Sequence, residues 1–135
     1  MSDLVIPREF IEQIVAHCRA CYPDEACGIL AGTGNRVTKV YAMKNAEPSP
    51  ISYFMDTGEQ FRVMKELRQE GLTMVAIFHS HPQSPAYPSA TDIRLAFYDD
   101  LFYVIAGMLN GTLSELRAFT IFGGEVREVK INVNG

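Results

Sequence analysis

Two histidines separated by a single residue are the most chemically informative feature of this sequence. His79 and His81 lie in the segment Ile77–Pro82, at the end of a nearly continuous apolar run. In an extended strand alternate side chains share a face, so both imidazoles should point the same way, roughly 6–7 Å apart along the chain. Two imidazoles on one face at the end of a rigid strand are suited to chelate a metal ion.

A carboxylate follows at a distance that could complete such a site. Asp92 lies eleven residues after His81, and Ser89 precedes it by three residues. If a loop and a short helix bring Asp92 back to the histidines, three protein ligands leave the fourth tetrahedral position to water. That arrangement is typical of catalytic rather than structural zinc.

Each of these residues also has a simpler interpretation. Histidines two residues apart can form hydrogen bonds within a turn, and Ser89 with Asp92 has the pattern of a helix capping box. Capping and metal binding by Asp92 are compatible, because a carboxylate has enough lone pairs for both. Pro82, Pro85 and Pro88 could form a ligand for a partner domain, although stiffening the loop is the simpler function.

The elements that would position these residues follow from the periodicity of the apolar residues and from capping signals. Helices are expected over about 7–21, from Asp56 or Thr57 to Gly71, and from Ser89 to about Tyr98. Strands are expected over 27–32, 36–43, 73–78, 101–108, 113–122 and 126–133, with a brief edge strand at 53–55. This order is neither a repeat nor a regular β-α-β alternation. We therefore expect an α+β fold in which helices flank a mixed, mostly antiparallel sheet.

Length and composition limit the class of protein. With 135 residues, 47% of them hydrophobic and 21% charged, the chain should fold as a single domain over residues 1–135. A net charge of −4 argues against electrostatic binding of nucleic acid. No segment approaches the roughly 20 apolar residues of a membrane helix, and three cysteines do not make a disulfide framework. We therefore expect a cytoplasmic protein that binds neither nucleic acid nor membranes.

The segment 79–92, HSHPQSPAYPSATD, resembles the JAMM motif of the MPN-domain metalloproteases, in which His-x-His-Pro is followed by Ser-x-x-Asp. The other half of that family's pattern is a glutamate shortly before a glycine-containing apolar strand. Glu25 lies two residues before Cys27-Gly28 and 54 residues before His79. The similarity extends to the order of elements, and it implies an MPN fold, with an architecture like that of cytidine deaminases, over the whole chain.

This resemblance implies a zinc-dependent peptidase or isopeptidase with one Zn²⁺ per chain and a catalytic water. It assigns the metal ligands to three side chains, His79, His81 and Asp92. It assigns Glu25 as general base and acid, and Ser89 as hydrogen-bond donor to the developing oxyanion. Asp24 is a rival to Glu25 as the base, and only the family pattern favours Glu25.

The substrate implied by the resemblance is the C-terminal end of a small protein. The best-known members cleave the isopeptide bond after the terminal glycine of ubiquitin, with inserted segments for which this chain has little room. It resembles instead the compact prokaryotic members, some of which hydrolyse the amide bond at the C-terminal glycine of a ubiquitin-like or sulfur carrier protein, releasing cysteine or a tail. The sequence does not indicate an oligomeric state.

Two alternatives remain open at this point. The first is a non-catalytic MPN scaffold or binding module that has lost its metal, although all ligand positions are filled here. The second is a zinc amidase that acts on small peptides without a protein partner. A zinc deaminase is set aside, because the His-x-Glu and Pro-Cys-x-x-Cys patterns of that class are absent from the sequence.

Overall fold

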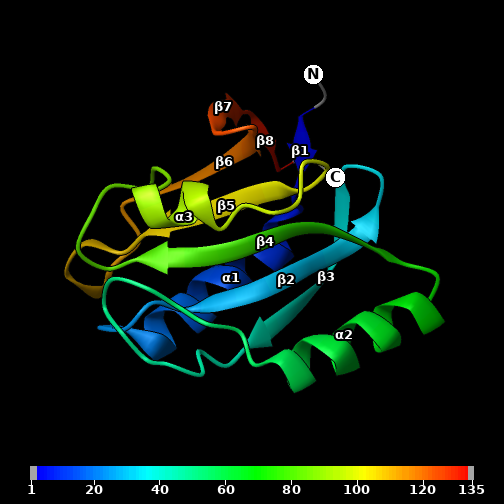
Figure 1. Ribbon diagram of the computed structural model, residues 1–135, viewed down its shortest axis with the longest axis horizontal. Helices are drawn as coiled ribbons and strands as arrows, with labels where there is room; N and C mark the ends of the chain where they lie inside the picture. The colour runs from blue at the N-terminus through cyan, green and yellow to red at the C-terminus, as the bar shows by residue number, and fades with distance from the viewer. Residues whose placement is uncertain (1–2, 134–135) are drawn as a thin grey trace.

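The strands of the protein form one mixed sheet with helices on both of its faces, as the computed structural model of residues 3–133 shows (Figure 1). The elements in chain order are β1 (Leu4–Val5), α1 (Arg8–Cys21), β2 (Cys27–Thr33), β3 (Arg36–Met43), α2 (Thr57–Gln69), β4 (Thr73–His81), α3 (Ala90–Arg94), β5 (Phe102–Gly107), the 3₁₀ turn η1 (Leu109–Gly111), β6 (Glu115–Phe122), β7 (Glu125–Val129) and β8 (Ile131–Asn132). Within residues 3–133 the strand order is β7-β6-β5-β4-β2-β3-β1-β8. The predicted α+β class is therefore confirmed.

Four of the seven strand pairings within residues 3–133 are antiparallel, which agrees with the expected mixed and mostly antiparallel sheet. β4 is antiparallel to β2 on one side and parallel to β5 on the other. Because both neighbours satisfy its backbone groups and both faces are covered, β4 is apolar almost throughout. No helix in the described part of the chain has the length and apolar character needed to cross a membrane.

Side-chain alternation along the central strands divides the core between the two faces of the sheet. One cluster joins these strands to α1, and it includes Ile14, Cys18, Leu30 and Phe78. The other cluster joins them to α2, and it includes Ile29, Val63 and Leu67, with Ile77 packed against it. In Figure 1, α1 lies behind the sheet, whereas α2 and α3 lie in front of it. His79 and His81 share the parity of Ile77, so the sequence pattern directs them to the face of α2 and α3.

Two short elements differ from the sequence-based expectation. Residues 53–55 do not form an edge strand, since Met55 makes only a single bridge with Asn45. The side chain of Asn45 holds this loop instead, because its Oδ1 accepts a hydrogen bond from the N–H of Phe54 at 3.0 Å. The third helix ends at Arg94 and not at Tyr98. The Tyr103 hydroxyl bonds to both the N–H and the carbonyl of Tyr98, which holds this residue outside the helix.

The expected strand over 126–133 is divided at Lys130 into β7 and β8, which lie at opposite ends of the strand order. Because a single residue separates them, the sheet must curl until its two edges lie side by side, at the top of Figure 1. β8 pairs in parallel with β1, with Leu4 opposite Ile131. The sequence did not predict β1, since two residues are too few to show any periodicity.

Candidate metal centre

β4 holds both histidines in the middle of the sheet. His79 lies between Cys27 of β2 and Ile105 of β5, and the strand continues to His81, three residues beyond its predicted end. The two side chains are buried, with exposed fractions of 2% and 3%. Because Ser80 alternates with them, both imidazoles point to one face of the sheet, as predicted, and this is the face of α2 and α3.

Asp92 reaches the histidines from the first turn of α3. The Oγ of Ser89 accepts a hydrogen bond from the N–H of Asp92 at 3.0 Å, and the Oδ2 of Asp92 accepts one from the N–H of Ser89 at 2.8 Å. This reciprocal pair is the capping box that the sequence indicated. It also fixes the rotamer of Asp92 so that the same Oδ2 faces the two imidazoles.

Three potential ligand atoms converge on one point. The Nε2 atoms of His79 and His81 are 3.1 Å apart, and the Oδ2 of Asp92 lies 3.2 Å from the first and 3.0 Å from the second. Tetrahedral ligands at zinc distances of about 2.0–2.1 Å are separated by about 3.3 Å. Within residues 3–133, these three side chains are the one group of His, Cys, Asp and Glu that could hold a metal ion. The group therefore fits zinc without a change in the backbone.

The proton arrangement of His81 also suits a cation. Its Nδ1 lies 2.8 Å from the carbonyl oxygen of Pro85. Since a carbonyl can only accept, Nδ1 carries a proton, and the neutral ring then has its lone pair on Nε2. That lone pair faces the Nε2 of His79 and the Oδ2 of Asp92. Electron-rich atoms this close require either a shared proton or a cation between them.

The pKa shifts of the three groups agree with this description. Burial opposes ionisation of Asp92, but its hydrogen bonds with the two histidines outweigh burial and hold the pKa of the carboxyl well below its ordinary value. Burial lowers the pKa of His79. For His81 burial acts in the same direction, but the hydrogen bonds with Asp92 and the Pro85 carbonyl leave its pKa raised. A divalent cation would therefore compete with a proton held between His81 and an ionised Asp92.

Glu25 lies beside this group and is itself buried, with an exposed fraction of 3%. The N–H of Ser80 donates to the carbonyl of Ala26 at 3.1 Å, and the N–H of Ala26 donates to the Oγ of Ser80 at 2.8 Å. This pairing places residue 25 next to His81. The Oε1 of Glu25 is buried without a hydrogen-bond partner among residues 3–133. Burial raises the pKa of this carboxyl to about 8. The charge of His81 lowers the pKa and that of Asp92 raises it, and both effects are smaller than that of burial.

The neighbouring acid, Asp24, is not part of this arrangement. Its side chain is half-buried, and its charge acts on Cys21 at the end of α1. The charges that act on Glu25, in contrast, are those of His81 and Asp92. Of the two candidate bases, the structure brings only Glu25 to the histidines.

Two residues of this region had no signal in the sequence. Asn45 donates a hydrogen bond from its side-chain amide to the carbonyl of Glu25 at 3.1 Å, and it thereby ties the loop before α2 to the segment that leads into β2. Tyr53, from that loop, stacks on His79 with ring centroids 4.8 Å apart. A single amide at a strand end and an aromatic residue in a loop belong to no motif or periodicity, so sequence patterns could not indicate them.

The proline loop over residues 82–88 is anchored to the sheet. Ala86 is fully buried and packs with residues of β5 and β6. The ring of Tyr87 packs edge-on against Phe119, with centroids 5.4 Å apart. Tyr87 thus holds the loop in place, and it is not among the residues that line the adjacent groove. The anchored loop keeps the carbonyl oxygen of Pro85 within hydrogen-bond distance of the Nδ1 of His81.

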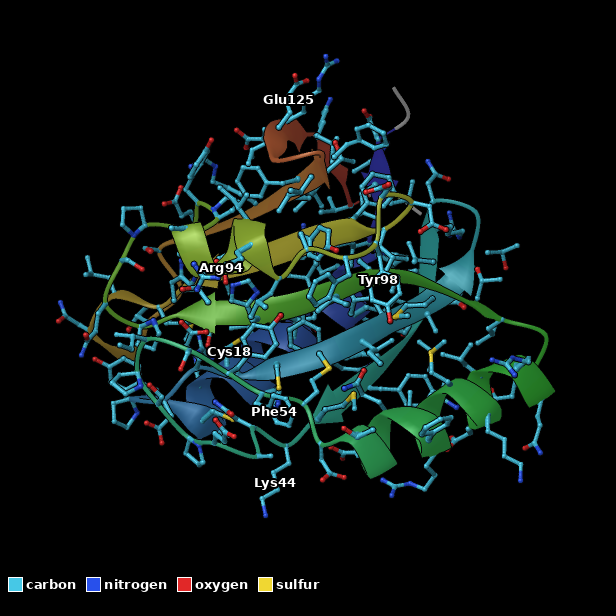
Figure 2. All side chains as sticks on the ribbon, in the orientation of Figure 1. Cys18, Lys44, Phe54, Arg94, Tyr98 and Glu125 are labelled. Carbon is cyan, nitrogen blue, oxygen red and sulfur yellow. The ribbon has the colours of Figure 1, made fainter. Side chains whose placement is uncertain are left out.

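A groove of about 400 Å³ leads to the convergent side chains. Its floor is the sheet, and His79 and Asp92 line one part of it. The loop before α2 forms one wall and α3 with the following segment forms the other, as Phe54 and Arg94 mark in Figure 2. Its most exposed apolar residues are Ile51, Phe54, Leu95 and Phe97. No lysine or arginine is among the described residues that line it.

Known proteins are similar to this chain in both sequence and fold. A CysO-cysteine peptidase of Mycobacterium tuberculosis (strain ATCC 25618 / H37Rv) is 41% identical over 132 residues, which are 96% of this chain and 90% of that protein. A probable TtuB-protein conjugate cleaving protease of Thermus thermophilus is 39% identical over 105 residues, covering 77% of this chain and 70% of that protein. The solution structure of protein DSY2949 from Desulfitobacterium hafniense has a TM-score of 0.83 and 37% identity, with 94% of this chain and 90% of that chain covered.

The family described as prokaryotic homologs of the JAB domain matches residues 7–121. This range contains the strand with the two histidines, the capping box of α3 and the buried Glu25. The resemblance to JAB/MPN proteins inferred from the motif is therefore confirmed, and the chain belongs to the family of prokaryotic homologs of the JAB domain.

Proposed function

We propose that this protein is a zinc-dependent metallopeptidase or isopeptidase that hydrolyses an amide bond at the C-terminal glycine of a ubiquitin-like or sulfur carrier protein, releasing cysteine or a tail. The observation that carries the proposal is the convergence of His79, His81 and Asp92 beside the buried carboxyl of Glu25. The hydrolase class is supported by the relatives that are named a peptidase and a protease.

One Zn²⁺ per chain would be held by Nε2 of His79, Nε2 of His81 and Oδ2 of Asp92. Two imidazoles and one carboxylate leave a position open, as in catalytic zinc sites. When bound, zinc supplies a Lewis acid that polarises the scissile carbonyl and lowers the pKa of a water molecule. The Pro85 carbonyl holds the tautomer of His81 in which Nε2 is free to bind.

Glu25 would carry the proton in both directions. Because burial raises its pKa to about 8, both protonation states are accessible near neutral pH, which is the condition for efficient general acid–base catalysis. Its Oε1 has no competing partner within residues 3–133. The carboxylate would accept a proton from the attacking water and then deliver it to the leaving amine.

Ser89 would stabilise the negative charge that develops on the carbonyl oxygen. Its Oγ accepts the N–H of Asp92 at the start of α3. A hydroxyl has one donor besides its acceptor lone pairs, so Ser89 can cap α3 and still donate to substrate. Such a donor is typically worth about 10²–10³ in rate.

The groove supports a tail as the substrate. Its walls are apolar and lack cations, so they suit an extended, uncharged segment better than a charged one. Glycine next to the cleaved bond permits a close approach to the buried side chains. The similar proteins are named for CysO-cysteine and for TtuB-protein conjugates. We extend that substrate class to this chain.

Two further properties belong to the proposal. Residues 1–135 form one JAB domain, which is supported by the family match over residues 7–121 and by the pairing of β1 with β8 in one sheet. The protein works in the cytoplasm, which is supported by three free cysteines, Cys18, Cys21 and Cys27, because a reducing compartment keeps thiols unpaired.

The direct test uses purified protein, one equivalent of zinc, and CysO extended by a C-terminal cysteine. Release of cysteine is expected from the wild type, and Glu25→Gln should abolish turnover while the zinc content stays unchanged. Wild-type protein that binds no zinc would support the scaffold alternative. Equal kcat/KM for the folded conjugate and for a short tail peptide would support the small-peptide amidase.

A further inference from the structure

The charges of α2 are divided between two sides of the helix. Glu66 and Glu70 both reach Lys39 of β3, with Nζ–oxygen distances of 3.5 and 2.8 Å. Glu59 accepts a hydrogen bond from the backbone N–H of Lys44 at 3.1 Å. The acidic side chains are thus used to hold the helix on the sheet.

The opposite side, which we call the outer face of α2, carries Phe61, Lys65 and Arg68, at the i, i+4 and i+7 spacing of one helical stripe. Phe61 is 75% exposed. Within residues 3–133, neither Lys65 nor Arg68 forms an ion pair. Because Val63 and Leu67 already anchor the helix in the core, packing does not explain an exposed aromatic ring one turn before the first of two cations that form no ion pair among the described residues.

The outer face is continuous with the groove that leads to the candidate metal centre. Gln60 lines both the groove and the hollow over the outer face. Its side-chain amide donates a hydrogen bond to the carbonyl of Met55 at 3.2 Å, so its position between the two is fixed. A protein that rests on α2 would therefore have a direct path along which to lay a terminal segment toward His79 and Asp92.

We infer that the outer face of α2 is the docking surface for the folded body of the carrier protein. The carrier would contact this face through an acidic patch on its own surface, with an apolar residue at the centre of that patch. This inference rests on the proposed function. Lys65 and Arg68 select the charge of the partner, because opposite charges across an interface speed encounter and fix orientation. Phe61 supplies the buried aromatic contact that such interfaces need. The groove then receives only the tail.

The test compares a folded substrate with its isolated tail. Zinc-loaded protein is assayed with CysO carrying a C-terminal cysteine, and with a peptide of the CysO C-terminal residues carrying the same cysteine. The double variant Lys65→Glu/Arg68→Glu should lower kcat/KM for the folded conjugate about tenfold at low salt, through KM, because each exposed charge contact contributes modestly and reversal adds repulsion. The value for the peptide should stay within about twofold of wild type.

A matched control has the same change in net charge elsewhere. Arg8→Glu/Lys130→Glu alters two exposed cations, one at the start of α1 and one between β7 and β8, and it should leave both substrates unaffected. Phe61→Ala should also weaken only the folded conjugate. If the peptide reacts too slowly, binding of the conjugate to zinc-loaded Glu25→Gln, with and without Lys65→Glu/Arg68→Glu, should show the same tenfold difference in Kd.

The outcomes separate the two proposals. If the wild type cleaves neither substrate, the proposed function fails and the docking surface fails with it. If the wild type cleaves the conjugate, three results would refute the docking surface alone. Lys65→Glu/Arg68→Glu could cleave the conjugate as well as wild type, or its kcat/KM for the peptide could fall by the same factor as for the conjugate. The third such result is an equal fall in kcat/KM for the control variant.

Discussion

Replacing Glu25 by glutamine should change the pH dependence of stability of the zinc-free protein. The ordinary pKa of this carboxyl is 4.5, and burial raises it to about 8 in the folded state. Between these values the folded protein keeps a proton that the unfolded chain has lost. The free energy of unfolding therefore falls as the pH rises from 4.5 toward 8, because stability decreases wherever the folded state binds more protons.

The magnitude follows from the same two values. A difference of 8 − 4.5 = 3.5 pKa units corresponds to about 4.8 kcal/mol over the whole window, at 1.36 kcal/mol per unit. Between pH 5 and pH 8 the expected loss is about 3–4 kcal/mol. Glutamine has nearly the same shape and does not ionise, so Glu25→Gln should be more stable than wild type at pH 8, with an advantage that shrinks by this amount at pH 5.

The assay is urea unfolding in the presence of a chelator at pH 5, 6.5 and 8, followed by circular dichroism. Glu9→Gln is the control for removing an acid as such, because Glu9 is an exposed residue of α1. Parallel curves for wild type and Glu25→Gln would refute the reasoning, since they would mean that the carboxyl is as well solvated in the folded protein as in the unfolded chain.

Three other substitutions test the packing around the site. Ser89→Ala should lower the free energy of unfolding by about 1 kcal/mol through loss of the α3 cap, and it should reduce kcat on the CysO–cysteine conjugate about 10²–10³-fold. Tyr87→Ala should weaken zinc binding about tenfold or more in a competition titration, because the loop carbonyl on His81 loses its support, whereas Tyr87→Phe should bind like wild type. Gly28→Ala should destabilise the protein by at least about 1–3 kcal/mol in urea unfolding, since an added Cβ would lie 2.1 Å from Cε2 of Phe78.

Local patterns were sufficient for the parts of the site that lie close together in the chain. Alternation along an apolar strand predicts that His79 and His81 share a face, because successive side chains of any strand point to opposite sides. The spacing of Ser89 and Asp92 predicts the capping box, because a helix start exposes backbone N–H groups that such side chains satisfy. Both predictions are confirmed in the structure. These rules operate within a few residues, so they can be read without knowing the fold.

Tertiary structure decided what depends on residues far apart in the chain. The register of β2 against β4 selects Glu25 over Asp24 and buries it. Its raised pKa follows from that burial and from no local pattern. The tie between Asn45 and Glu25, the pairing of β1 with β8 and the free cations on α2 are also products of assembly. Contacts of this kind form only when distant segments pack together, and periodicity within one segment carries no information about the partner it will meet.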